Sequence, residues 1–421
     1  MDLRSLYSKS TATMKSSMIR EMLAQTKGVP GMISFAGGFP SPATFPTKVL
    51  AELTSEVIRE SGADILQYGA SEGDTMLKEA IIDWEATNSP LEKGAEGGAG
   101  NNSSIALTQN QLLICNGATN GIYYFTKAFI NQDDVILCEG PTFLGSVVSF
   151  EAVGAKVISV DMDNDGIMID KLSAVIKDLK SKNKTIKFLY TIPDFQNPTG
   201  ITMSLQRRHD LIKLMQAENI LILEDDPYRE LRYTGERIPS LFEIARKEYN
   251  DTKLVTVIKS YSKILGPGLR LAAAIGHEDI IKPMCSWLQK VIVNPDGVAQ
   301  RAVAKYIKKG YLKDHIDSIC KYYQPYQEAI TQALTKYMPK GVNFTKPEGG
   351  IFVWLNTEKN INFDEIFKEV ITQKVCYIPG SKFYPEGFEK HNCLRLNFSY
   401  PTIEQINNGV EILANVIKNK L

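Results

Sequence analysis

Residues 254–276 read LVTVIKSYSKILGPGLRLAAAIG, two apolar runs joined by a polar connection that contains a Gly-Pro-Gly turn. The runs 254–259 and 271–276 have the length and composition of strands that are covered on both faces. Lys263 follows the first run, where an ammonium group must find a partner or lose its charge. A lysine that forms a covalent C=N bond meets that requirement. Taken alone, Lys263 also fits a solvated loop lysine, so the rest of the chain has to decide.

The residues around Lys263 are suited to an anion. Ser260 and Ser262 place hydroxyl groups close to it in the chain, and Arg270 follows the Gly-Pro-Gly turn. Hydroxyl groups and a guanidinium are groups that hold a phosphate well. The segment therefore favours a phosphate group near a nucleophilic lysine.

Outward from this stretch, residues 111–276 alternate short apolar, β-branched runs with longer helical patterns. The alternation predicts an α/β fold with a mostly parallel sheet wrapped by helices. Polar or glycine-containing residues follow several of the runs, and in such sheets ligands bind at the carboxyl ends of the strands. The other expected strands are residues 111–115, 135–138, 156–160, 186–191 and 220–223.

Beyond Ile280 the pattern becomes mostly helical to about Tyr337 and then changes to short strands with two helices. We expect a smaller α+β domain here, completed by the N-terminal segment. The expected strands are residues 342–345, 352–355, 375–378 and 394–398, and the expected helices are residues 364–373 and 402–418. The expected division is an N-terminal segment (1–45), a large ligand-binding domain (46–290) and a small domain (291–421). Residues 93–104, rich in Gly, Asn and Ser, predict a surface loop.

The composition of the 421-residue chain limits its partners. Its 48 basic and 48 acidic residues cancel, whereas an electrostatic nucleic-acid binder carries a basic excess. The six cysteines form no CxxC pair and the four histidines no HxxxH pair, which argues against a metal site. No run approaches the length of about 20 apolar residues that spans a membrane, and the N-terminus lacks the apolar core of a signal peptide. We expect no nucleic acid, metal or membrane partner, and a cytoplasmic location.

Three further motifs follow expected strands. In EDDPY, residues 224–228, Asp225 can keep a pyridinium nitrogen protonated while Tyr228 reaches the neighbouring phenolate oxygen. In NPTG, residues 197–200, Asn197 could donate to the same oxygen. In NGATNG, residues 116–121, a glycine turn leads into a helix whose free amides suit a phosphate. An acidic helix cap and a plain Asn-Pro turn are the simpler interpretations of the first two motifs.

Together, and in this order, the four motifs resemble those of the class I aminotransferases of pyridoxal-phosphate fold type I, over nearly the whole chain. The SYSK segment followed by PGLR is specific to that pattern. The chain is most similar to the branch of 2-aminoadipate, kynurenine and aromatic aminotransferases. The stretches that carry this similarity are ISFAGG (33–38), FQNPTG (195–200), EDD (224–226) and PEGGIF (347–352). The resemblance implies pyridoxal 5′-phosphate as cofactor, bound in the large domain.

The resemblance also implies roles for the matching residues. Lys263 would hold the cofactor covalently and, once substrate displaces it, act as the base that moves a proton from the substrate Cα. Asp225 would pair with the pyridine nitrogen. Asn197 and Tyr228 would hydrogen-bond the ring hydroxyl, and Phe143 would stack on the ring. The residues expected at the phosphate are Gly117, Ala118, Thr119, Ser260, Ser262 and Arg270.

Four other positions concern the substrate and a partner subunit. Tyr68 matches a tyrosine that reaches the partner's phosphate, which implies a homodimer with shared active sites. Arg395 would grip the substrate α-carboxylate, which a guanidinium does well, and is otherwise a strand-end salt bridge. The backbone of Gly38 would contact the substrate at the entrance of its binding site. Arg20 falls where aminoadipate-type enzymes carry an arginine that reads the substrate side chain, and is otherwise a solvated helix residue.

The chain departs from the family pattern in a few places. Phe143 stands where a tyrosine is common, Ala118-Thr119 where a Ser-Gln pair is common, and Gly266 where a serine is common. The insert at residues 93–104 has no counterpart that we can match. None of these changes removes a catalytic group.

The expected activity is transfer of an amino group from an L-amino acid to a 2-oxo acid, with 2-oxoglutarate as acceptor and a ping-pong mechanism. The donor stays open among 2-aminoadipate, aromatic and branched-chain amino acids, since one methylene changes binding by only about 1–3 kcal/mol. A pyridoxal-phosphate-dependent C–S lyase would share the same residues. A non-catalytic regulator domain is a third alternative, but it would need a DNA-binding domain ahead of the fold, and only about 30 residues precede Ile33.

Overall fold

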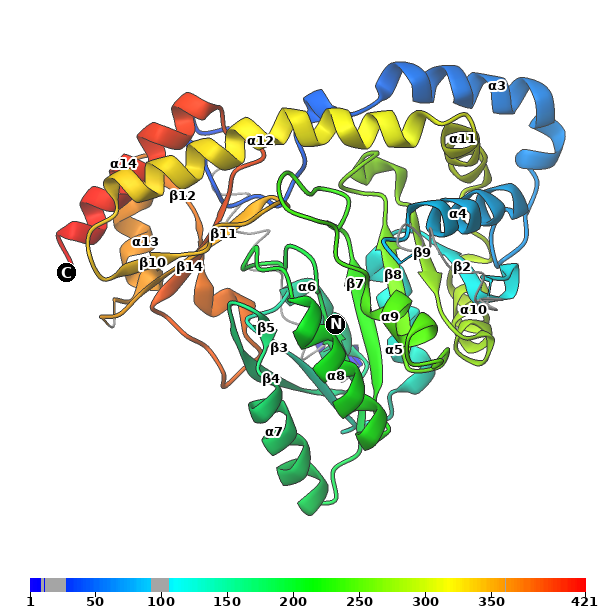
Figure 1. Cartoon of the computed structure of the whole chain (residues 1–421), viewed down its shortest axis with the longest axis horizontal. Coiled ribbons are helices and arrows are strands. Elements are labelled where there is room, and N and C mark those ends of the chain that lie inside the picture. The colour runs from blue at the N-terminus through cyan, green and yellow to red at the C-terminus, as the bar shows by residue number, and fades with distance from the viewer. Residues whose placement is uncertain (9–10, 12–27, 92–105, 360) are drawn as a thin grey trace.

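A computed structural model of the chain describes residues 1–8, 11, 28–91, 106–359 and 361–421. The largest sheet in these residues comprises β2 (Leu112–Cys115), β3 (Val135–Gly140), β4 (Lys156–Asp163), β5 (Gly166–Ile167), β6 (Ile186–Thr191), β7 (Leu221–Asp226), β8 (Val255–Ser260) and β9 (Ala272–Ile275). The strands lie in the order β2-β9-β8-β7-β6-β3-β4-β5. Figure 1 shows β2, β9, β8 and β7 of this sheet. β9 is antiparallel to both neighbours and β5 to β4, while the other neighbouring pairs are parallel. The predicted α/β fold with a mostly parallel sheet is confirmed.

Two groups of helices pack on this sheet. In the first, α6 (Leu144–Ala152) and α10 (Glu278–Ile292) both contact α5 (Ala118–Phe129). In the second, α7 (Ile169–Ser181) and α9 (Leu241–Lys247) both contact α8 (Leu205–Glu218). The local sequence sets the helix ends: the side chain of Ser204 accepts from the amide of Arg207 at the start of α8, and Asn219 ends it in a left-handed conformation.

A second, antiparallel sheet has the order β10-β11-β14-β13. Its strands are β10 (Val342–Phe344), β11 (Phe352–Thr357), β13 (Ile378–Pro379) and β14 (Cys393–Asn397), and its core includes residues of α13 (Phe363–Thr372) and α14 (Ile403–Lys418). Phe35 is buried in the same core. The short strand β1 (Ile33–Ser34) pairs in parallel with β12 (Val375–Cys376), so the segment around residue 33 joins this part of the molecule.

The helix α12 (Tyr311–Tyr337) connects the two cores. Leu312 and Tyr323 pack in the core of the large sheet, whereas Ile330 and Leu334 pack in that of the small sheet (yellow in Figure 1). The remaining helices of the described residues are α11 (Gly297–Lys308) and the two helices that contact it, α3 (Thr47–Ile65) and α4 (Thr75–Asn88). Short 3₁₀ turns are η1 (Leu3–Leu6), η2 (Pro42–Thr44), η3 (Gln109–Gln111), η4 (Pro267–Leu269) and η5 (Gly380–Phe383). The division of the chain at residues 45 and 290 stays a prediction.

Several strands differ from those expected. β7 and β8 run beyond their predicted ends at residues 223 and 259, so Asp225 and Ser260 lie inside strands instead of after them. The register explains the difference, because Asp225 pairs with Ile258 and hydrogen bonds from neighbouring strands override low strand propensity. β5 was not expected, and the stretch 375–378 divides into β12 and β13. Residues 93–104 lie outside the described residues.

In the described part of the chain, no helix is long and apolar enough to cross a membrane. The cytoplasmic location stays a prediction from the sequence.

Candidate active site

Lys263 lies in the turn after β8, at the carboxyl end of the central strands. Its ammonium group donates to the carbonyl oxygen of Gly38 at 2.8 Å. Burial of the side chain, together with the positive charges of Arg395 and Arg270, lowers the pKa of Lys263 to about 8, against the opposing effect of Asp225. A lysine in this state loses its proton close to neutral pH, as a nucleophilic amine requires.

Arg395, on β14, comes from the other end of the chain to the same place. Its Nη2 donates to the carbonyl oxygen of Ala36 at 2.6 Å, and its Nη1 donates to Oδ1 of Asn197 at 3.0 Å. The guanidinium lies over the rings of Phe352 and Phe383, 4.3 Å and 4.8 Å from their centroids. Lys263 and Arg395 are thus both tied to carbonyl groups of residues 36–38.

Arg395 is a buried cation whose partners are neutral. The residue is 3% exposed, its Nε has no hydrogen-bond partner, and no carboxylate of the described residues forms an ion pair with it. Burial lowers the pKa of Arg395 to about 10. The strand-end salt bridge considered as the simpler interpretation is therefore not present in the described residues.

Asp225 lies near the end of β7 and is buried. Its Oδ2 accepts from the hydroxyl group of Tyr190 at 2.6 Å, while its Oδ1 has no hydrogen-bond partner. Burial raises the pKa of Asp225 to about 7, and the charge of Asp226 adds to this. Tyr228 is also buried, and its hydroxyl group accepts from Nδ2 of Asn197 at 3.5 Å. A buried carboxylate oxygen without a donor is an available acceptor for a ligand.

The predicted phosphate end is built around Gly117 and Arg270. Gly117 has φ of +88° and precedes α5, whose first turn no side chain caps. The guanidinium of Arg270 crosses this turn, with Nη2 at 3.5 Å from the carbonyl oxygen of Asn116. A Cβ atom on Gly117 would lie 2.4 Å from Nη2 of Arg270, so only glycine allows this approach. Nearby in the chain, Oγ of Ser260 accepts from the amide of Ser262 at 3.3 Å.

The remaining predicted residues lie apart from these contacts. Phe143 is half-buried and immediately precedes α6. Tyr68 projects from the loop between α3 and α4 with 79% of its surface exposed. Among the described residues, no hydrogen bond or ring contact joins Tyr68 to Lys263, Arg395 or Asp225. Arg20 lies outside the described residues, so its role stays a prediction from the sequence.

A buried carboxylate shapes the turn that carries Asn197, and the sequence analysis did not identify it. Glu139, in β3, accepts from the amide of Ile192 and from Nε2 of Gln196, both at 3.2 Å. Oε1 of Gln196 in turn accepts from the amide and hydroxyl group of Thr199. Burial raises the pKa of Glu139 to about 7. The hydrogen bonds of Glu139 and Gln196 therefore hold the turn that carries Asn197. Glu139 lies far from this turn in the sequence, so no local sequence pattern predicts the contact.

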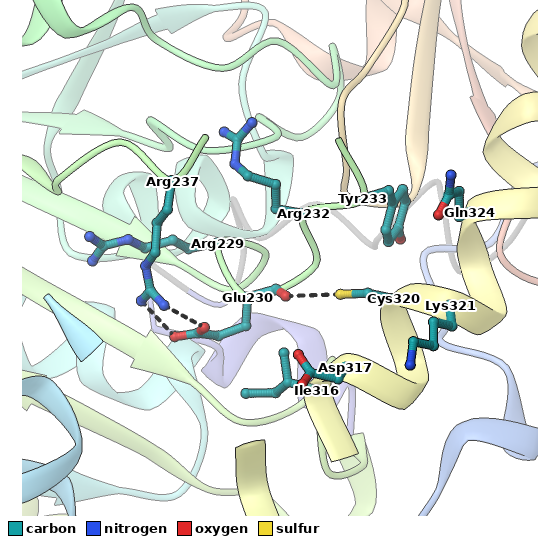
Figure 2. Close-up of a pocket in the computed structure, with 10 residues that line it drawn as sticks. All are labelled: Arg229, Glu230, Arg232, Tyr233, Arg237, Ile316, Asp317, Cys320, Lys321 and Gln324. Atoms are coloured by element: carbon teal, nitrogen blue, oxygen red, sulfur yellow. Dashed lines mark hydrogen bonds and ion pairs between the residues drawn. The ribbon is translucent and has the colours of Figure 1, made fainter. Parts of the chain in front are cut away.

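A separate cavity of about 340 Å³ lies between the loop after β7 and α12 (Figure 2). Its three arginines are paired: Arg237 binds the carboxylate of Glu230 with two contacts of 3.0 Å, Arg232 pairs with Glu348, and Arg229 pairs with Glu243. Cys320 donates to the backbone oxygen of Glu230 at 3.3 Å. The predicted catalytic residues do not line this cavity.

The fold and the cluster of Lys263, Asp225 and Arg395 are those expected of the pyridoxal-phosphate enzymes of fold type I. The family model for aminotransferase class I and II matches residues 31–413, and this chain belongs to that family. It is 32% identical to aromatic-amino-acid aminotransferase 1 of Thermococcus litoralis, over 100% of this chain and 96% of that protein.

Several solved structures are similar over 100% of this chain, and two of them are named with a bound form of the cofactor. The Pyrococcus horikoshii kynurenine aminotransferase, in complex with PMP, has a TM-score of 0.91 at 32% identity, with 98% of that chain covered. The alpha-aminoadipate aminotransferase of Thermus thermophilus, complexed with N-(5′-phosphopyridoxyl)-L-leucine, has a TM-score of 0.86 at 30% identity, with 99% covered. This chain is an aminotransferase with pyridoxal phosphate as its cofactor.

The residues of this structure fit that cofactor. The partnerless Oδ1 of Asp225 is a buried acceptor for a protonated ring nitrogen. The uncapped first turn of α5 and the guanidinium of Arg270 form a cradle for a phosphate. Lys263 supplies an amine with a lowered pKa.

Proposed function

We propose that this enzyme transfers the amino group of an L-amino acid, either 2-aminoadipate or an aromatic or branched-chain amino acid, to 2-oxoglutarate in a ping-pong reaction. The observation that carries the proposal is Arg395, a buried guanidinium with a free Nε and only neutral partners. A cation in such surroundings is stabilised by a carboxylate, and every amino acid and 2-oxo acid supplies one. Its link to Lys263 through residues 36–38 supports a single binding site for both substrates.

The names of the relatives support the range of donors. The T. litoralis relative is named for aromatic amino acids, and the P. horikoshii structure for kynurenine. The T. thermophilus structure is named for alpha-aminoadipate and contains a leucine adduct. An acidic and an aliphatic side chain thus both fall within the range of this group, and we extend that range to the present chain.

The side chains divide the proposed chemistry among them. When bound, pyridoxal phosphate supplies an electron sink that stabilises negative charge at the substrate Cα. Nζ of Lys263, neutral above about pH 8, accepts the proton from that Cα. Arg395 binds the substrate α-carboxylate and orients the Cα–H bond toward Lys263. Asp225 would hold the ring nitrogen, Tyr228 and Asn197 the ring hydroxyl, and Arg270 with the turn at Gly117 the phosphate.

A panel of amino donors tests the proposal. With 2-oxoglutarate as acceptor, glutamate formation should be measurable for at least one of the three donor classes, and initial rates at several fixed acceptor concentrations should give parallel double-reciprocal lines. A cysteine conjugate without any oxo acid separates the lyase alternative. Release of pyruvate and ammonia from it, with no transfer from any donor, would contradict the proposed function.

We also propose a homodimer in which Tyr68 completes the partner's phosphate site. The exposed side chains of Tyr68 and its neighbour Leu66, at 79% and 71%, support a contact surface at this loop.

A further inference from the structure

A chain of three hydrogen-bonded side chains ends at Asp225. Oγ of Ser146 donates to the hydroxyl oxygen of Tyr190 at 2.9 Å, and that hydroxyl group donates to Oδ2 of Asp225 at 2.6 Å. All three residues are buried, with 0% of Tyr190 exposed. The chain leaves the other oxygen of Asp225, Oδ1, without a partner.

The register of the central sheet creates this contact. Tyr190 on β6 is paired with Leu223 on β7. Asp225 is two residues further along β7, so its side chain lies on the same face of the sheet as that of Leu223 and therefore of Tyr190. Ser146 comes from α6, and the ring of Phe150 on the same helix packs edge-on against Tyr190 at 5.3 Å. The phenol ring of Tyr190 is thus held by α6 and by the carboxylate of Asp225.

The directions of the two hydrogen bonds follow from the charges. Burial and the carboxylate of Asp225 raise the pKa of Tyr190 well above its usual value, so its hydroxyl group stays protonated and acts as a donor. Around Asp225, burial and Asp226 favour the neutral carboxyl group, while the hydrogen bond from Tyr190 and the charge of Lys263 favour the carboxylate. Tyr228, neutral at ordinary pH, is the other titratable group that faces Asp225.

We propose that Tyr190 is a positioning residue that keeps Asp225 ionised and turns its free oxygen toward the cofactor, with Ser146 orienting the phenol. The inference rests on the proposed pairing of Asp225 with the ring nitrogen. Removing the hydroxyl group of Tyr190 frees Oδ2 and removes a donor to the charged form, so Asp225 binds the ring less well at neutral pH.

The chain offers a matched control for removal of a tyrosine hydroxyl group. Tyr261 is also buried, at 1% exposure, but its hydroxyl group has no hydrogen-bond partner. Tyr261→Phe therefore deletes the same atom from a buried ring without breaking a hydrogen bond. A structural role of the ring alone predicts the same result for Tyr190→Phe and Tyr261→Phe.

The experiment measures binding of pyridoxal phosphate to the apoenzyme by absorbance between pH 6 and pH 9. Tyr190→Phe should raise the dissociation constant at pH 7 roughly tenfold to a hundredfold, the effect of losing a hydrogen bond to a charged group. The pH below which affinity falls should also move upward. Tyr261→Phe should match the wild type on both measures. Because the charge of Asp225 also raises the pKa of Lys263, the titrations are repeated with each variant combined with Lys263→Ala, where the remaining difference between variants reports on Asp225.

Two more variants complete the test. Ser146→Ala should also weaken binding of pyridoxal phosphate, but by less than Tyr190→Phe. The melting temperature of each apoenzyme shows whether the variant folds. If Tyr190→Phe does not fold, Ser146→Ala still tests the hydrogen bonds that lead to Asp225. Asp225→Asn should weaken binding at all pH values. If Asp225→Asn weakens binding but Tyr190→Phe and Ser146→Ala behave like Tyr261→Phe, the positioning role is wrong. If Asp225→Asn binds like the wild type, the proposed role of Asp225 itself is wrong.

Discussion

At the scale of the residue, the surroundings of Lys263 set the pKa of its amine. Burial and the charges of Arg395 and Arg270 lower its pKa, while Asp225 opposes them. The neutral amine is therefore available at a pH at which an exposed lysine is almost fully charged.

We predict that the rate of covalent capture of pyridoxal phosphate by the apoenzyme rises with pH and levels off above about 8, because only the neutral amine of Lys263 attacks a carbonyl group. Stopped-flow absorbance measures the rate, and borohydride reduction followed by mass spectrometry identifies the labelled residue. Lys263→Ala should show no labelling at this position. A rate that keeps rising to the ordinary lysine value of 10.5 would contradict the lowered pKa.

A second residue-scale prediction concerns Arg395→Lys. The lysine keeps the positive charge, but it cannot bind the substrate carboxylate in a bidentate manner or stack on Phe352 and Phe383. We therefore expect kcat/KM for L-amino acids to fall about a hundredfold. Affinity for pyridoxal phosphate should change little. A primary amine that lacks the carboxylate is the matched substrate, and its slower turnover should be nearly unaffected. Equal losses for both substrates would make Arg395 a structural residue.

At the scale of the element, α8 holds the segment that carries Asn197. Arg208 is 0% exposed and donates to the carbonyl oxygens of Pro193, Met203 and Pro239, at 3.2, 3.1 and 2.9 Å. It also pairs with Asp194 at 2.9 Å. Arg208 thus ties the start of α8 to residues before and after the turn that carries Asn197, namely Pro193 and Asp194 before it and Met203 after it.

We predict that Arg208→Leu destabilises the fold by about 3–5 kcal/mol, because it leaves the carboxylate of Asp194 buried beside the weaker contact of Arg232. The neighbouring Arg207→Leu is the control. Arg207 pairs with a half-exposed Asp163 and donates to the carbonyl oxygens of Gly166 and Ile167, and its loss leaves no buried carboxylate, so it should cost only about 1–2 kcal/mol. Urea denaturation followed by tryptophan fluorescence compares the two variants, and equal midpoints would refute the prediction.

The start of α5 gives the second prediction at this scale. Gly117→Ala adds a Cβ atom 2.4 Å from Nη2 of Arg270 at a φ of +88°, which should displace the guanidinium and weaken pyridoxal-phosphate binding roughly tenfold or more. Gly268→Ala is the control in the adjoining turn, since its Cβ would meet no atom within 4 Å. Fluorescence titration of the apoenzymes measures both constants. Equal constants for the two variants would show that the close approach is not needed.

At the scale of the whole molecule, the site is assembled from distant parts of the chain. Arg395 and its acceptor Ala36 are 359 residues apart, and Arg395 and Asn197 are 198 apart. α12 packs in both cores and so connects the two sheets between which these residues meet. Tyr68 is largely exposed, and within the described residues no hydrogen bond or ring contact joins its side chain to Lys263, Asp225 or Arg395.

Mixed dimers test whether Tyr68 acts across the interface. Lys263→Ala and Tyr68→Ala chains, each of low activity alone, should regain part of the activity after mixing and reassociation, because one site of the hybrid has both residues intact. Lys263→Ala mixed with Arg270→Ala should regain none, since those two residues serve the same site from one chain. No recovery in the first mixture, or a fully active monomer in sedimentation, would contradict the shared sites.

The sequence by itself determined the pattern of strands and helices and the motifs at the carboxyl ends of β6, β7 and β8. Lys263, Asp225 and Asn197 could be singled out as candidates because each follows a recognisable apolar run, but their roles came from the resemblance to a family and stay predictions. The family followed from the order of those motifs. Each of these signals is local, so no knowledge of long-range contacts was needed.

The tertiary structure alone decided what these residues contact. Tyr190 meets Asp225 because of the register between β6 and β7, and Glu139 supports the turn of Asn197 from a third strand. That Arg395 has neutral partners, and that Tyr68 is exposed, likewise depends on which segments pack together. Strand pairing and burial arise from contacts between residues far apart in the chain, and no local pattern of apolar and polar residues records them.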